Sequence, residues 1–116
     1  AGLAPKPGKA LDGESLLPLL RQTGDLERDA VFFHYPNYAW HMGNRLGGAV
    51  RSGRFKLIRR YDDDSLELYD LSQDLGETRN VAPARPNLSH AMNSRLEAWL
   101  KQTGAPMPRP PKGKRN

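Results

Sequence analysis

The sequence has 116 residues, enough for one small domain, and its hydrophobic fraction of 37% predicts a modest core built by one sheet and one helix. It contains no cysteine, which excludes disulfides, thiolate nucleophiles and cysteine zinc sites, and no apolar run reaches the roughly 18 residues that span a bilayer. The net charge of +5 admits an anionic partner, but the basic residues are scattered, which favours ordinary solvated surface.

The N-terminal part, residues 1–29, is predicted to be a connector that carries one short helix. Its first residues are rich in proline and glycine, which favours an extended chain. Asp12 or Ser15 can cap a helix over about residues 15–22. That helix holds four leucines within five residues, and they need an apolar surface that a chain this short is not expected to supply in full. Because Ala1 is not a natural start, we expect a fragment or a processed product.

The next segment is a short apolar and aromatic run that ends at Pro36, which predicts a strand over Ala30–Tyr35. Because this run does not alternate with polar residues, we expect burial on both of its faces. The strand belongs either to the sheet of this domain or to the main sheet of a missing N-terminal domain. Residues 37–46 then form a loop whose length favours a functional or docking role.

Residues 47–82 are predicted to form the centre of the fold, as antiparallel strands joined by tight turns. We expect strands near residues 49–51, 54–61 and 66–71, with a two-residue turn at Ser52 and Gly53. The three aspartates at 62–64 make a tip that like charges keep in water. Successive side chains of the second strand point to opposite faces of the sheet. One face carries Phe55, Leu57, Arg59 and Tyr61, and the other carries Lys56, Ile58 and Arg60.

The C-terminal part predicts an amphipathic helix that begins with Asn87 as its cap and stops at Gly104. Its apolar stripe comprises Leu88, Met92, Leu96, Trp99 and Leu100. Residues 105–116 are expected to be a disordered basic tail. The predicted fold is therefore α+β, a small antiparallel sheet of three to four strands packed against a C-terminal helix, in a domain that spans residues 30–104.

Five segments of the chain also resemble a known family. They are LDGESLLPLL at 11–20, AVFFHYPNY at 30–38, GGAVRSGRFKLIRRY at 47–61, LELYDLSQDLGETRNVA at 66–82 and RLEAWLKQTGAPMP at 95–108. Their order and spacing are similar to those in the C-terminal part of type I sulfatases, the arylsulfatase-like branch of the alkaline-phosphatase superfamily. One departure is Leu75, where the family pattern usually has proline. The resemblance implies a C-terminal piece of a protein that hydrolyses sulfate esters.

The resemblance implies chemistry that this chain does not carry itself. Type I sulfatases make formylglycine from the first residue of a C/S-x-P-x-R motif and bind calcium nearby, and no such motif occurs in this sequence. We therefore expect no catalytic residue and no metal ligand in the chain, which should be inactive alone. Formylglycine and calcium are implied for a missing N-terminal catalytic domain, the expected partner. The family also implies a sulfated substrate, no membrane and a periplasmic or secreted location.

Two interpretations stand for the histidines and tyrosines on and after the aromatic strand, His34, Tyr35, Tyr38 and His41. In the first, they help to wall the substrate pocket of the whole enzyme, with histidine donating a hydrogen bond and an aromatic ring stacking on the substrate. In the second, His34 is a satisfied strand residue and the aromatic rings only pack. The two histidines lack the further ligands that a metal needs, and residues 62–64 lack the spacing of an EF-hand.

Two other classes of function remain as alternatives. The basic and aromatic residues of the second strand could form a small nucleic-acid-binding surface. However, alternation divides those charges between two faces of the sheet, and no known nucleic-acid signature appears in the sequence. Nucleic acid is therefore an unlikely partner. A stand-alone interaction domain would be favoured if the gene encoded nothing upstream.

Overall fold

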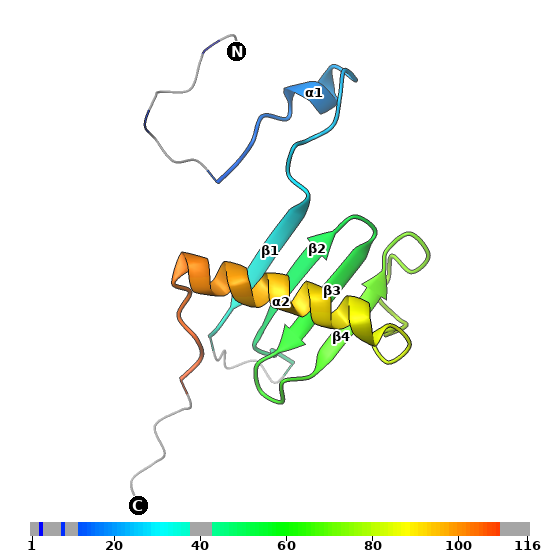
Figure 1. The fold of residues 1–116 in the computed structure, drawn as a ribbon, viewed down its shortest axis with the longest axis vertical. Helices are drawn as coiled ribbons and strands as arrows, with labels where there is room; N and C mark the ends of the chain where they lie inside the picture. Colours follow the sequence, from blue (N-terminus) through cyan, green and yellow to red (C-terminus); the bar gives the residue numbers. More distant parts are fainter. Residues whose placement is uncertain (1–2, 4–7, 9–11, 38–42, 110–116) are drawn as a thin grey trace, which may run out of the picture.

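The computed structural model describes residues 3, 8, 12–37 and 43–109, which form one four-stranded antiparallel sheet with a helix across one face (Figure 1). The strands follow the order β1-β2-β3-β4, and each pairs with its neighbour in sequence. The α+β fold with a C-terminal helix is confirmed. The elements are α1 (Leu17–Leu20), β1 (Ala30–Tyr35), β2 (Gly47–Ser52), β3 (Phe55–Arg60), β4 (Leu66–Asp70) and α2 (Pro86–Thr103).

The core lies between α2 and the sheet. Val50, Leu57 and Leu68 stand opposite one another in register on β2, β3 and β4, and all three are fully buried. The helix covers them with buried Met92, Leu96 and Leu100, so the predicted apolar stripe is confirmed. At the β1 side, Phe32 stacks on Trp99 with ring centroids 5.1 Å apart. Each large side chain contributes on the order of 1.5–3 kcal/mol through burial.

The helix ends differ in detail from the sequence prediction. α2 begins at Pro86, whose missing N–H costs nothing in the first turn, and Arg85 rather than Asn87 is the N-cap. The helix ends as predicted at Gly104, where a φ of 62° favours glycine. α1 is shorter than residues 15–22 because only Leu17–Leu20 are helical.

The expectation that β1 is buried on both faces is wrong. β1 pairs with β2 along its whole length, at the edge of this sheet, and α2 covers only one side. Its residues therefore alternate, and Val31, Phe33 and Tyr35 are exposed at 39%, 55% and 44%. Their apolar character reflects a face that the described part of the chain leaves open.

The turn between β2 and β3 is one residue later than predicted. Ser52 pairs with Phe55, which leaves Gly53 and Arg54 as the two loop residues. Gly53 has a φ of 57°, the left-handed conformation that two-residue hairpin loops require. With this turn, Leu57 pairs with Val50, and both side chains face the helix.

Replacing Leu96 with alanine should lower the free energy of unfolding by about 2–5 kcal/mol, because it opens a cavity at the centre of the helix–sheet contact. Urea unfolding of the chain, followed by circular dichroism, measures this. Leu75→Ala is the matched control, since Leu75 is 82% exposed on a turn and should change stability by less than about 0.5 kcal/mol. Equal losses for both variants would contradict the described core.

Candidate functional site

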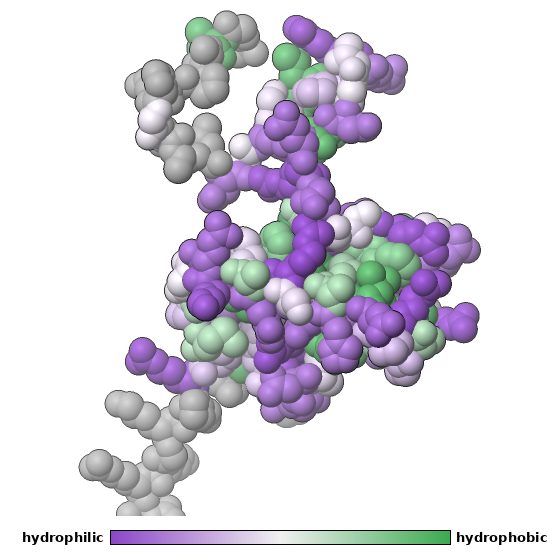
Figure 2. All heavy atoms as spheres, in the orientation of Figure 1, coloured by the Kyte–Doolittle hydropathy of each residue, from purple (hydrophilic) through white to green (hydrophobic). Residues whose placement is uncertain are grey.

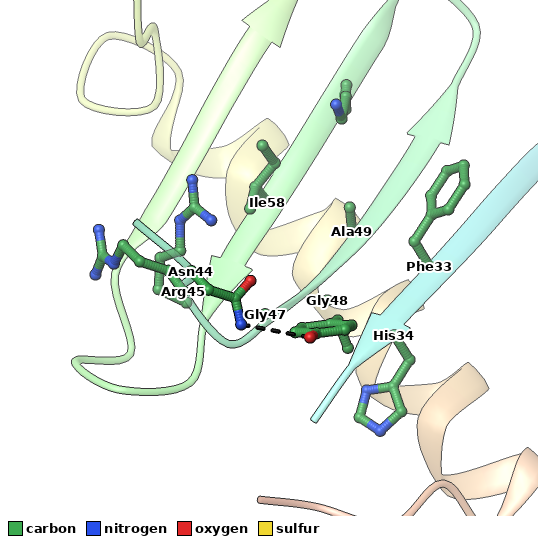
Figure 3. A pocket seen from close by; sticks show the side chains of 11 residues that line it. Phe33, His34, Asn44, Arg45, Gly47, Gly48, Ala49 and Ile58 are labelled. Atoms are coloured by element: carbon green, nitrogen blue, oxygen red, sulfur yellow. Dashed lines mark hydrogen bonds between the residues drawn. The ribbon is translucent and has the colours of Figure 1, made fainter. Parts of the chain in front are cut away.

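A hollow of about 520 Å³ lies on the sheet face that α2 does not cover. Figure 3 shows it with the helix behind the strands, and with Phe33, Ala49 and Ile58 on its floor. Asn44 and Arg45 border it where the chain enters β2. It therefore adjoins the loop that the sequence marked as functional. His34, Tyr35, Lys56 and Arg60 complete the polar part of its lining.

The cations around this hollow are already paired with carboxylates. Arg60 Nε donates to Glu67 Oε1 at 2.8 Å, and Lys56 Nζ donates to Glu77 Oε1 at 2.6 Å. These four side chains are only 19–30% exposed, so both ion pairs are partly buried. Arg45 binds the carboxylates of Asp62 and Asp63 at 3.0 and 2.8 Å. The hollow thus offers ion pairs rather than free positive charge.

Glu67 accepts hydrogen bonds from two neighbours. The Arg60 hydrogen bond, with help from the Tyr69 hydroxyl, which donates to Glu67 Oε2 at 2.7 Å, holds the pKa of Glu67 below its ordinary value of 4.5. Burial, followed by the hydrogen bond to Glu67, raises the pKa of Tyr69 to about 12. The Glu67 carboxylate and the Tyr69 hydroxyl therefore each stay in one ionisation state across neutral pH.

His34 lies on the opposite side of β1 from Tyr35, as alternation requires. Its Nε2 is 2.8 Å from the carbonyl oxygen of Pro106, which can only accept, so Nε2 carries the proton. In the neutral ring, Nδ1 then accepts from the Tyr61 hydroxyl at 2.8 Å. Burial raises the pKa of Tyr61, which keeps its proton on the oxygen. His34 therefore ties β1 to the end of β3 and to the segment after α2.

Gly48 makes room for this contact. A Cβ atom there would lie 2.4 Å from the Tyr61 hydroxyl oxygen and 3.3 Å from Leu96 Cδ2. Such approaches are closer than packed atoms tolerate, so only glycine fits at this position of β2 without displacing Tyr61.

The predicted site residues divide into three groups. Tyr35 borders the hollow, and its hydroxyl accepts from Asn44 Nδ2 at 3.4 Å (dashed in Figure 3). His34 is also among the residues that line the hollow, but its ring nitrogens bind Tyr61 and Pro106. Tyr38 and His41 lie outside the described residues. Sequence reasoning missed Phe33, whose position two residues before Tyr35 in the strand could have shown that both share a face.

The described residues contain no group of three or more histidine, cysteine, aspartate or glutamate side chains that could hold a metal ion. Two of the aspartates at the tip bind Arg45, and the third, Asp64, binds Arg59 at 2.9 Å. These residues therefore do not fit a calcium site. In the same part of the chain, no helix is long and apolar enough to cross a bilayer.

Comparison with known proteins identifies sulfatases as relatives of this chain. Residues 2–103 match the model of the C-terminal region of N-sulphoglucosamine sulphohydrolase. The chain belongs to this family of sulfatase C-terminal domains. It is 34% identical to a sulfatase of Formosa agariphila over 108 residues, which cover 83% of this chain and 19% of the relative. It is 33% identical to human arylsulfatase A in an alignment of length 114, with coverages of 77% of this chain and 22% of that protein.

Solved structures share the fold of this sulfatase C-terminal domain. A putative sulfatase from Bacteroides thetaiotaomicron superposes with a TM-score of 0.71 at 24% identity, over 89% of this chain and 22% of that one. A structure in complex with its substrate D-glucosamine-2-N,6-O-disulfate gives 0.65 at 29% identity, over 87% and 21%. The chain thus spans about a fifth of the length of the proteins it matches.

Replacing Glu67 with glutamine should remove an acid-dependent part of the stability. A carboxylate whose pKa is lowered by folding stabilises the fold above about pH 4.5, and this contribution is lost as the pH falls through the folded pKa. The difference in free energy of unfolding between the natural chain and Glu67→Gln should therefore be largest near neutral pH and shrink below pH 4.5. Urea unfolding at pH 7, 5, 4 and 3 measures it.

The exposed Glu27 provides the control, because Glu27→Gln removes a carboxylate that has no hydrogen bond among the described residues. A difference between Glu67→Gln and the natural chain that stayed constant down to pH 3 would contradict the role of the Arg60–Glu67 pair.

Proposed function

We propose that this domain forms the C-terminal part of an enzyme that hydrolyses sulfate esters, and that the reacting groups lie upstream of it. The match over residues 2–103 carries the proposal, since the matched family is the C-terminal region of a sulfatase and the relatives are about five times longer. Formylglycine and calcium would belong to the upstream catalytic domain. The lack of a cysteine and of a cation-binding cluster among the described residues supports that division.

The proposed substrate is a sulfated saccharide. The chain is 38% identical over 76 residues to an N-acetylglucosamine-6-O-sulfatase of Bacteroides thetaiotaomicron. A structural relative at 29% identity binds a disulfated glucosamine as its substrate. Human arylsulfatase A is a relative of similar identity, so aryl sulfates are the comparison class for the assay.

We further propose that the segment from His34 to His41 takes part in substrate binding. Tyr35 has its side chain on the open face, beside the hollow that adjoins the loop. His34 would act as a positioning residue, because its two ring nitrogens fix the end of β1 from which that loop leaves. Tyr38 and His41 follow within the loop and are proposed on the sequence alone.

The proposed division of the chain follows from these roles. Residues 1–29 would connect this domain to the catalytic domain, residues 30–104 would form the structural domain, and residues 105–116 would form a basic tail. A nucleic-acid-binding function is not favoured, because Arg45, Lys56, Arg59 and Arg60 each face a carboxylate.

The longer protein, with its upstream sequence, should release sulfate from sulfated glucosamine, whereas the 116-residue chain should release none. Ion chromatography of free sulfate measures this for a panel of N-sulfated, O-sulfated and aryl substrates. The control replaces the first residue of the upstream C/S-x-P-x-R motif with alanine. Sulfate release that survives this control, or an upstream sequence without the motif, would overturn the proposal.

In the longer enzyme, Tyr35→Ala and His41→Ala should each raise KM by about tenfold, which corresponds to losing one hydrogen bond or stacking contact to substrate. His90→Ala is the matched control, because His90 is exposed on α2. Steady-state kinetics measure KM and kcat. An unchanged KM in both Tyr35→Ala and His41→Ala would contradict the proposal that the segment from His34 to His41 binds substrate.

A further inference from the structure

The two edges of the sheet differ in how their backbone is satisfied. At β4, the outward N–H of Leu68 donates to Asn80 Oδ1 at 2.9 Å, and its carbonyl accepts from the Val81 N–H at 2.8 Å. The chain therefore covers this edge with its own segment, which is a common protection against unwanted strand pairing.

The β1 edge has no such cover within the described residues. Ser52 and Phe55 flank the two-residue loop and form a hydrogen-bonded pair, and pairing alternates from there along β2. The peptide groups of Val31 and Phe33 must then point to β2. Those of Phe32 and His34 point outward, and neither has a backbone partner beyond the sheet in the part of the chain described.

A groove of about 510 Å³ runs beside this edge. Phe32 and Trp99, stacked in parallel, form one part of its lining, and Ala30 and Thr103 also line it. On the other side of the strand, Val31 and Phe33 are exposed. An added strand would find backbone partners along the edge and apolar side-chain contacts on both faces of the sheet.

Four exposed leucines lie on α1 and at its N-cap, within a segment whose residues Asp12 and Arg28 line the same groove. Leu16, Leu17, Leu19 and Leu20 are 45–78% exposed. A loop closes beneath them, because the Arg28 N–H donates to both Glu14 carboxylate oxygens at 3.2 Å, and the Arg28 guanidinium donates to the Asp12 carbonyl. Asp12 and Arg28 also line the groove. Figure 2 shows the apolar atoms of this segment above a hydrophilic neck.

We propose that the free edge of β1 accepts an added strand from the upstream part of the same sulfatase, and that the same partner covers the α1 leucines. This inference rests on the proposed function, since it needs an upstream domain. The relatives contain about four times more chain than is present here, and the leucines and two lining residues of the groove, Asp12 and Arg28, belong to residues 12–28, near the end at which upstream chain would join. A tethered partner also has a high effective concentration.

A second copy of this chain fits the observations less well. Two β1 edges could pair about a twofold axis, but such pairing gives no reason for four exposed leucines on a closed loop beside the edge. One upstream domain accounts for both uncovered surfaces.

Amide hydrogen exchange in the longer enzyme tests the proposal. The amides of Phe32 and His34 should exchange at least 100-fold more slowly than the rates of an unstructured chain, as the Leu68 amide should, because an added strand accepts their hydrogen bonds. Mass spectrometry with residue-level fragmentation measures them. Fast exchange at Phe32 and His34, with slow exchange at Val31, Phe33 and Leu68, would overturn the proposal.

Two further arms identify the occupant. Leu17→Ser combined with Leu20→Ser should speed exchange at Phe32 and His34 at least tenfold and leave Leu68 unchanged, whereas the exposed control Leu75→Ser should change neither. Exchange rates that depend on protein concentration would assign the edge to a second copy and overturn the proposal. Sulfate release is scored separately, so an active enzyme with a fast-exchanging edge refutes only this inference. Protected amides in an inactive enzyme refute only the proposed activity.

Discussion

The contact between one helix and one face of a four-stranded sheet is the constraint on which the other features depend. Leu96 and its neighbours on α2 cover Val50, Leu57 and Leu68, and the described chain supplies no second helix of comparable length for the opposite face. With a single layer of side chains as its core, the domain must satisfy every other surface by different means. Three such means are the ion pairs on the open face, the covered β4 edge and the hydrogen bonds at the end of β1.

On the open face of the sheet, the charged side chains are satisfied by ion pairs within the chain. Arg60 with Glu67 and Lys56 with Glu77 are half-buried, and each is held by a contact between neighbouring strands or between a strand and the turn after β4. Ion pairs near the surface contribute little to the free energy of folding. They do let another surface approach without leaving an unpaired charge behind, because each group already has its partner.

At the end of β1, a histidine with two hydrogen bonds lies opposite a glycine and holds the strand in place. His34 binds Tyr61 and Pro106, and the Tyr61 hydroxyl keeps its place because Gly48 has no side chain beside it. Three strands and the segment after α2 thereby meet at one point, and the loop of residues 37–46 begins next to it. The end of β1, which this loop follows in the sequence, is therefore held by contacts that adjoin the core.

The sequence predicted the elements whose residues repeat at a regular spacing. The stripe from Leu88 to Leu100 identified α2, and alternation along β3 separated its two sides, of which the side with Leu57 faces the helix. The prediction failed at β1, since the open face of this edge strand is as apolar as a buried one, and Val31 and Phe33 cannot reveal which side is covered. Nor could sequence spacing reveal contacts such as His34 to Pro106, which join residues 72 positions apart.

The paired charges also limit what the domain can contribute to a sulfate ester enzyme. A sulfate group needs cations or N–H donors that are free to approach it, and Arg45 and Arg60 beside the hollow are each already bound to a carboxylate. Tyr35 and Asn44 offer uncharged polar groups at the hollow, which suit hydroxyl groups and the flat face of a sugar ring. Under the proposed function, sulfate recognition therefore falls to the upstream domain, while this domain reads the saccharide that carries the sulfate.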